Sequence, residues 1–149
     1  MAKAPARLRA LVLDSGALIA QERPAGRALL AAMIAAAIEE DATIVVPASA
    51  IAESWRPQAA GNRSPLAATV NAVPALDEAT AYRIGELNGA TRRSALAGAH
   101  VALEAMNQAP CIVLTSDPSD IATLLTHLGV TNAVGDKATK KTQVRIELC

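Results

Sequence analysis

The stretch LVLDSGALIA, residues 11–20, is the most informative for the fold, because a single acid follows directly after an apolar run. Leu11, Val12 and Leu13 are typical of the end of a buried strand, and Asp14 follows them without a spacer. An isolated buried charge is costly, so a carboxylate beside a dry core must be hydrated, paired or bound to a metal ion. The first question that the sequence raises is therefore what Asp14 is paired with.

Three apolar runs of this kind predict the core of a sheet. LRALVLD (8–14), ATIVVP (42–47) and CIVLTSD (111–117) lack strict alternation, as strands buried on both faces of a parallel sheet do. Alternating TQVRIEL (142–148) predicts a last, edge-type strand. The other segments predict helices over 26–40, 48–56, 64–71, 77–88, 94–107 with Ser94 as N-cap, and 118–128 before Gly129, with a loop at 56–65. This order predicts one α/β domain over residues 1–149, with a mostly parallel central sheet flanked by helices.

Composition limits the classes of function. Hydrophobic residues make up 52% of the chain and aromatic residues only 1%, which argues against base-stacking platforms for RNA. The formal net charge is zero, so no global basic field indicates nucleic-acid binding, and small clusters such as Arg92-Arg93 can equally be solvated surface. The apolar run 28–38 is shorter than the ~20 residues that span a bilayer. Two cysteines without metal or disulfide spacing favour a cytoplasmic protein, with Cys111 as a buried thiol.

Acidic residues follow the predicted strands. Asp14 and Asp117 each end a strand, and Glu53 lies in the helix after IVVP. Ligands of open α/β sheets bind at the carboxyl ends of the strands, and converging carboxylates need a cation between them, for which hard oxygen ligands select Mg²⁺ or Mn²⁺. Thr115, Ser116 and Asp120 are neighbours that could assist. Each acid also has a plainer interpretation, because an Asp after a strand often caps the next helix and a single helical Glu is usually solvated.

The ordered set of segments resembles the PIN-domain family, and within it the VapC-type toxins of bacterial toxin–antitoxin modules. The matching pieces are LVLDSGALIAQER, IVVPASAIAESWR, AVPALDEATAYRIGEL, AHVALEA and VLTSDPSDIATLL, in family order between residues 8 and 128. The resemblance implies a three-layer α/β sandwich, usually a homodimer. It also implies a metal-dependent endoribonuclease, inhibited by a VapB-like antitoxin that occupies the acidic cleft.

The resemblance implies that Asp14, Glu53 and Asp117 are catalytic and metal-binding acids. It fails at the helix before AHVAL, where Gly98 and Ala95 stand at two positions that carry acids in the family. Glu104 cannot replace them, since six residues on it faces roughly the opposite way at about 100° per residue. Gly98 in mid-helix has two compatible interpretations, namely close packing of another helix and a decayed catalytic site.

Two functions remain open from the sequence. The first is a VapC-like, Mg²⁺- or Mn²⁺-dependent ribonuclease with an impaired metal site, in which Arg56, Arg92 and Arg93 contact RNA phosphates. The second is a non-catalytic PIN-fold module that binds RNA or an antitoxin. In both, the broad apolar faces of the Ala-rich helices predict a homodimer.

Overall fold

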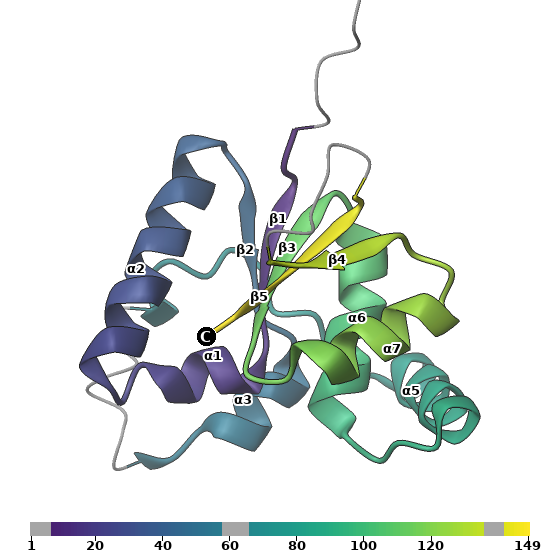
Figure 1. Cartoon of the computed structure of the whole chain (residues 1–149). Helices are drawn as coiled ribbons and strands as arrows, with labels where there is room; N and C mark the ends of the chain where they lie inside the picture. The colour runs from purple at the N-terminus through teal and green to yellow at the C-terminus, as the bar shows by residue number, and fades with distance from the viewer. Residues whose placement is uncertain (1–6, 58–65, 136–141) are drawn as a thin grey trace, which may run out of the picture.

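A computed structural model describes residues 7–57, 66–135 and 142–149 of the chain (Figure 1). The predicted helix at 64–71 and the predicted loop at 56–65 fall partly outside these residues. The elements, in chain order, are β1 (Ala10–Leu13), α1 (Ser15–Ala20), α2 (Pro24–Glu39), β2 (Thr43–Val45), α3 (Ala48–Ser54), α5 (Glu78–Thr91), α6 (Leu96–Gln108), β3 (Cys111–Thr115), α7 (Pro118–His127), β4 (Asn132–Val134) and β5 (Val144–Leu148).

The five strands form one sheet in the order β2-β1-β3-β5-β4, and every pair is parallel. The predicted α/β class is therefore confirmed. The prediction of an edge strand at 142–148 is wrong, because β5 lies between β3 and β4. Val144 and Ile146 are fully buried, whereas Arg145 is exposed. The alternation in this strand thus reflects helices packed on only one of its faces rather than a place at the edge of the sheet.

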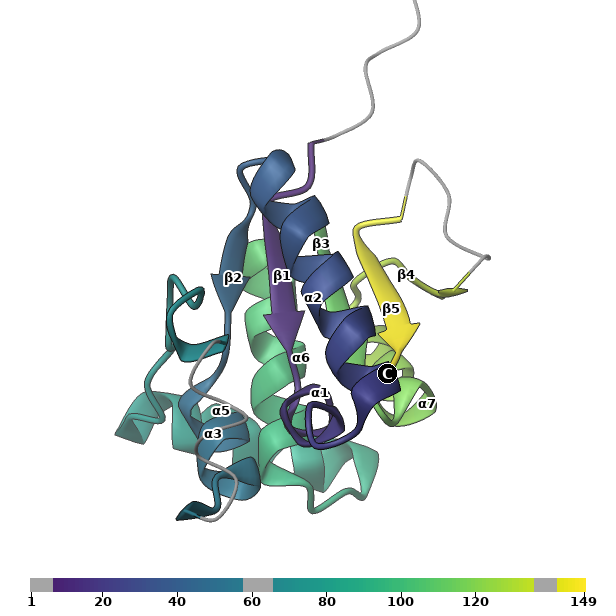
Figure 2. The same cartoon turned by 90° about the vertical axis from the view of Figure 1, so that its left-hand side faces the viewer.

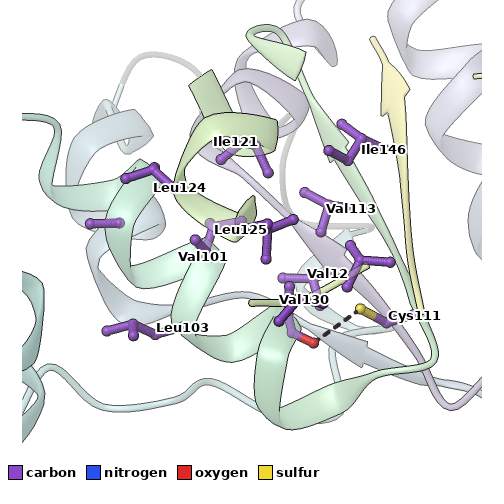
Figure 3. Close-up of a cluster of buried hydrophobic side chains, with 14 of the residues drawn as sticks. Val12, Val101, Leu103, Cys111, Val113, Ile121, Leu124, Leu125, Val130 and Ile146 are labelled. Carbon is purple, nitrogen blue, oxygen red and sulfur yellow. Dashed lines mark hydrogen bonds between the residues drawn. The ribbon is translucent and has the colours of Figure 1, made fainter. Parts of the chain in front are cut away.

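Helices cover the sheet in two layers, so the molecule is a three-layer sandwich (Figure 1). Alternate residues of β1 point to opposite faces, as in any strand. Leu11 and Leu13 pack with α1 and α2. Val12 packs with the helices α5, α6 and α7 on the other face, in the cluster that Figure 3 shows. The two cores consist almost entirely of Ala, Leu, Val and Ile, because the aromatic side chains Trp55 and Tyr82 are exposed.

Because all strands are parallel, their carboxyl ends lie at one edge of the sheet. Figure 2 shows the arrowheads of β1 and β5 pointing the same way, toward α1. The chain enters α1 directly after β1, α3 shortly after β2 and α7 shortly after β3, so these three helices begin at that edge. We call it the carboxyl edge.

Two details of the helices differ from the prediction. Helix α6 begins at Leu96 with Ala95 as its N-cap, and not at Ser94. Gly98 is consequently the third residue of the helix rather than a mid-helix residue. Cys111 is buried as predicted: its thiol donates a hydrogen bond to Ala105 O at 3.4 Å (Figure 3), and burial raises its pKa to about 12. In the part of the chain that the structure describes, no helix is both long and apolar enough to span a membrane.

Candidate functional site

Asp14 is the buried acid at the carboxyl edge. The residue is 7% exposed, and its side chain caps the N-terminus of α1. Oδ1 accepts a hydrogen bond from Ser15 N at 2.7 Å, and Oδ2 accepts one from the Thr115 hydroxyl at 2.7 Å. The N-cap interpretation is thus confirmed for Asp14. Its hydrogen-bond partners are the first turn of α1 and the last residue of β3.

Burial is the largest influence on Asp14, and it raises the pKa of the carboxyl group above its ordinary value. The hydrogen bonds from Thr115 and Ser15 favour the charged form and partly oppose this rise, whereas the nearby charge of Glu53 adds to it. The protein therefore holds a carboxylate in a place where its negative charge is incompletely compensated.

Glu53 approaches Asp14 through a shared hydroxyl group. Ser15 Oγ lies 3.2 Å from Glu53 Oε1 and 3.5 Å from Asp14 Oδ1. A serine hydroxyl carries one proton and can donate it to one acceptor at a time. Two carboxylates, of the buried Asp14 and the exposed Glu53, thus lie close to one donor.

The helix that carries Glu53 is fixed by a contact that the sequence did not indicate. Ser49, one turn before Glu53 on α3, lies with its hydroxyl 2.7 Å from Nδ1 of His100 on α6, and both side chains are buried. Burial lowers the pKa of His100, which favours the neutral ring, and the charge of Asp77 partly offsets this effect. A single His in an apolar helix gives no sequence signal for this role.

Asp117 is exposed and caps α7, since its Oδ1 accepts a hydrogen bond from Asp120 N at 3.1 Å. Its own backbone N–H donates to Thr115 Oγ1 at 3.0 Å, so Thr115 joins the loop after β3 to Asp14. Ser116 is exposed and lies against Gly16. A Cβ at Gly16 would be only 2.9 Å from Ser116 N, so this close approach of α1 to the loop requires glycine.

Asp120 lies in the first turn of α7, with its side chain 23% exposed, and pairs with Arg93. The guanidinium donates through Nε to Asp120 Oδ1 and through Nη1 to Thr91 O at 3.1 Å. Arg93, which was predicted to contact RNA, thus forms an ion pair with an acid of its own chain, and no local pattern in the sequence indicates this pair. We use the name acidic rim for the side chains of Asp14, Glu53, Asp117 and Asp120.

Gly98 faces Asp120 from α6, and the Ala95 side chain lies beside position 98. A Cβ at Gly98 would lie 3.6 Å from Asp120 Oδ2 and 3.9 Å from Leu124 Cδ1. These are ordinary van der Waals distances, so the packing of α6 against α7 does not require glycine. An acid at position 98 would stand beside Asp120. Glu104 lies six residues further along α6 and is half-buried, and burial raises the pKa of its carboxyl group.

Two of the three arginines that were predicted to contact RNA lie on the surface. Arg56 follows α3 and is exposed. Arg92 is exposed too, and it ends α5 in the left-handed conformation with φ of 56°. Neither side chain forms an ion pair with an acid within the described ranges.

The predicted metal ligands are only partly gathered. Within residues 7–57, 66–135 and 142–149, no three or more His, Cys, Asp or Glu side chains form a group that could hold a metal ion. Asp14 and Glu53 share Ser15, while Asp117 is linked to Asp14 through Thr115. A site built from all three carboxylates therefore stays a prediction. Comparison with known protein families and with curated proteins finds no match for this chain.

Proposed function

We propose that this chain is a VapC-like endoribonuclease that depends on Mg²⁺ or Mn²⁺ and has an impaired metal site. The observation that supports the proposal is the convergence of Asp14 and Glu53 on the Ser15 hydroxyl at the carboxyl edge of a parallel sheet. Ligands of such sheets bind at this edge. Two close carboxylates with one proton donor between them are a setting that a cation would stabilise.

The residues present fit one cation. Mg²⁺ is commonly bound by one or two carboxylates, with waters and substrate phosphates completing its coordination. Asp14 and Glu53 would hold it, and Thr115 would fix the orientation of Asp14 through the 2.7 Å hydrogen bond. A second cation lacks ligands, because Gly98 and Ala95 carry no acid and Asp120 is paired with Arg93.

A bound cation would supply charge stabilisation to a phosphodiester and lower the pKa of a water molecule. The protein's own contribution is to hold Asp14 in a dry, hydrogen-bonded position and to keep Glu53 beside it by anchoring α3 on α6 through Ser49 and His100. Arg56 and Arg92 are exposed and would contact RNA phosphates, which makes RNA binding salt-sensitive. The expected location is the cytoplasm.

RNA cleavage and Mn²⁺ binding test this proposal together. We expect cleavage of single-stranded RNA that requires Mn²⁺, is abolished in Asp14→Asn and is strongly reduced in Glu53→Gln. Glu39→Gln is the matched control, because Glu39 ends α2 just before β2, away from the carboxyl edge. Cleavage that continues in EDTA, or that is unchanged in Asp14→Asn, would contradict the proposal.

The lack of acids at positions 95 and 98 favours a second function. Glycine at position 98 and the Arg93–Asp120 pair also suit a non-catalytic PIN-fold module that binds RNA or a VapB-like antitoxin. An apolar pocket of about 180 Å³ between α1 and α3, bordered by Leu18, Ile51 and Trp55, supports a protein partner. This function predicts tight binding without cleavage at any Mn²⁺ concentration.

We also propose a homodimer, since exposed apolar side chains such as Leu29 and Ile38 lie on α2. Sedimentation at micromolar concentration tests this, and a monomer there would contradict it.

A further inference from the structure

The Arg93–Asp120 pair joins two segments that are 27 residues apart. Arg93 follows α5, and Asp120 lies in the first turn of α7. The two side chains are 29% and 23% exposed, so the pair is largely shielded from solvent. A guanidinium remains protonated at all physiological pH values and prefers carboxylate partners. Arg93 is therefore a permanent positive charge beside the acidic rim.

The two carboxylate oxygens of Asp120 have different neighbours. Asp120 Oδ1 accepts from Arg93, while Oδ2 lies 3.6 Å from where a Cβ of Gly98 would stand. The backbone N–H of Asp120 donates to Asp117, whose own N–H donates to Thr115, the hydroxyl partner of Asp14. Asp120 is thus connected to Asp14 by a short chain of hydrogen bonds, at the position where α6 lacks an acid.

We propose that Arg93 serves as a built-in counter-cation of the acidic rim and keeps Asp120 from binding a divalent cation. This inference rests on the proposed function, because it concerns the same rim. With Gly98 contributing no carboxylate, one guanidinium is enough to compensate Asp120. The same pairing removes a ligand that the rim would otherwise offer to Mg²⁺ or Mn²⁺, so the chain supplies a cation of its own at this end of the rim.

Replacing Arg93 by an uncharged residue therefore creates a stronger cation site. In Arg93→Gln, Asp120 is released next to Asp117 and without a cationic partner. We expect the dissociation constant for Mn²⁺, measured by calorimetric titration of the full chain, to fall about tenfold, because the affinity of oxygen ligands for a hard cation rises with the number of charged ligands. Far-UV circular dichroism checks the fold, and Arg93→Met, which keeps the aliphatic stem, provides a second variant.

Two further variants separate the release of Asp120 from a simple loss of positive charge. Arg83→Gln removes the same charge from an exposed position on α5 and should leave the Mn²⁺ affinity at its wild-type value. Arg93→Gln combined with Asp120→Asn should lose the gain. The inference is overturned if both Arg93 variants bind Mn²⁺ no better than wild type, or if the gain survives Asp120→Asn.

These outcomes are distinct from failure of the proposed function. That function fails if Asp14→Asn leaves RNA cleavage unchanged in the wild-type background, whatever Arg93 does. Conversely, a wild-type protein that needs Asp14 for cleavage, together with an Arg93→Gln variant of unaltered Mn²⁺ affinity, would retain the function and refute the role of Arg93.

Discussion

Helix α6 begins without a side-chain cap, and this makes Ala95→Asp and Gly98→Ala stabilising substitutions. Ala95 is the N-cap, with extended backbone at φ of −77° and ψ of 111°, and no side chain accepts a hydrogen bond from the first turn. A new Asp or Asn there stabilises a helix by about 1 kcal/mol. Gly98→Ala adds less than the about 0.5–1 kcal/mol that this change contributes in mid-helix, because position 98 is in the first turn; its Cβ meets its nearest neighbours at 3.6 Å or more, so no clash opposes the gain.

The double variant should therefore gain about 1–2 kcal/mol, which corresponds to a rise in Tm of roughly 2–8 °C for a chain of this size. Thermal unfolding followed by circular dichroism in EDTA measures this gain without any contribution from metal. Ala95→Asn should be at least as stable as Ala95→Asp in EDTA, because both residues cap the helix and only Asp adds a negative charge near Asp120. An Ala95→Asp variant no more stable than wild type in EDTA would refute the assignment of the uncapped helix start.

The same positions also test the acidic rim when Mn²⁺ is added. Gly98→Asp places a carboxylate beside Asp120, so in EDTA it should be less stable than Gly98→Ala. We expect Mn²⁺ to reverse this order, to raise RNA cleavage by Gly98→Asp, and to raise it further when Ala95→Asp is combined with it. A folded Gly98→Asp protein with unchanged Mn²⁺ affinity and cleavage would favour the non-catalytic module.

Three other predictions follow from single groups. Asp14→Asn should raise Tm in EDTA at pH 7, because the raised pKa of Asp14 means that its charged form destabilises the fold above that pKa. The same variant should abolish the stabilisation by Mn²⁺. If Mn²⁺ raises the Tm of the variant as much as that of wild type, Asp14 is not a ligand. The lowered pKa of His100 means that its neutral ring stabilises the fold above pH ~6.5 and that this stability is lost as the pH falls. The free energy of unfolding in urea should therefore fall less between pH 7 and pH 5 in His100→Gln than in wild type. Buried Cys111, whose pKa is raised to about 12, should resist alkylation until the protein unfolds, while half-buried Cys149 reacts in the folded state. Equal labelling rates of the two thiols would contradict the burial of β3.

Local sequence was sufficient for the elements that depend on local chemistry. The aliphatic runs before Asp14 and Asp117 are strands because such residues suit positions buried on both faces of a parallel sheet. Both acids cap the following helix, as an acid between a strand and a helix commonly does. The order of strands and helices was enough to predict an α/β domain with a mostly parallel sheet flanked by helices, because parallel strands require crossover connections.

Tertiary structure decided what depends on residues distant in sequence. Alternation in Val144–Leu148 is the same for an edge strand and for an interior strand covered on one face, and only the position of β4 distinguishes them. Nothing local pairs Arg93 with Asp120 or brings Ser15 to Glu53, because these contacts depend on how α5, α7, α1 and α3 meet at the carboxyl edge. The sequence by itself determined which acids stand at the ends of strands. Their charge balance was set by the packing, because a hydroxyl or a guanidinium compensates a carboxylate only when the fold places it within hydrogen-bond reach.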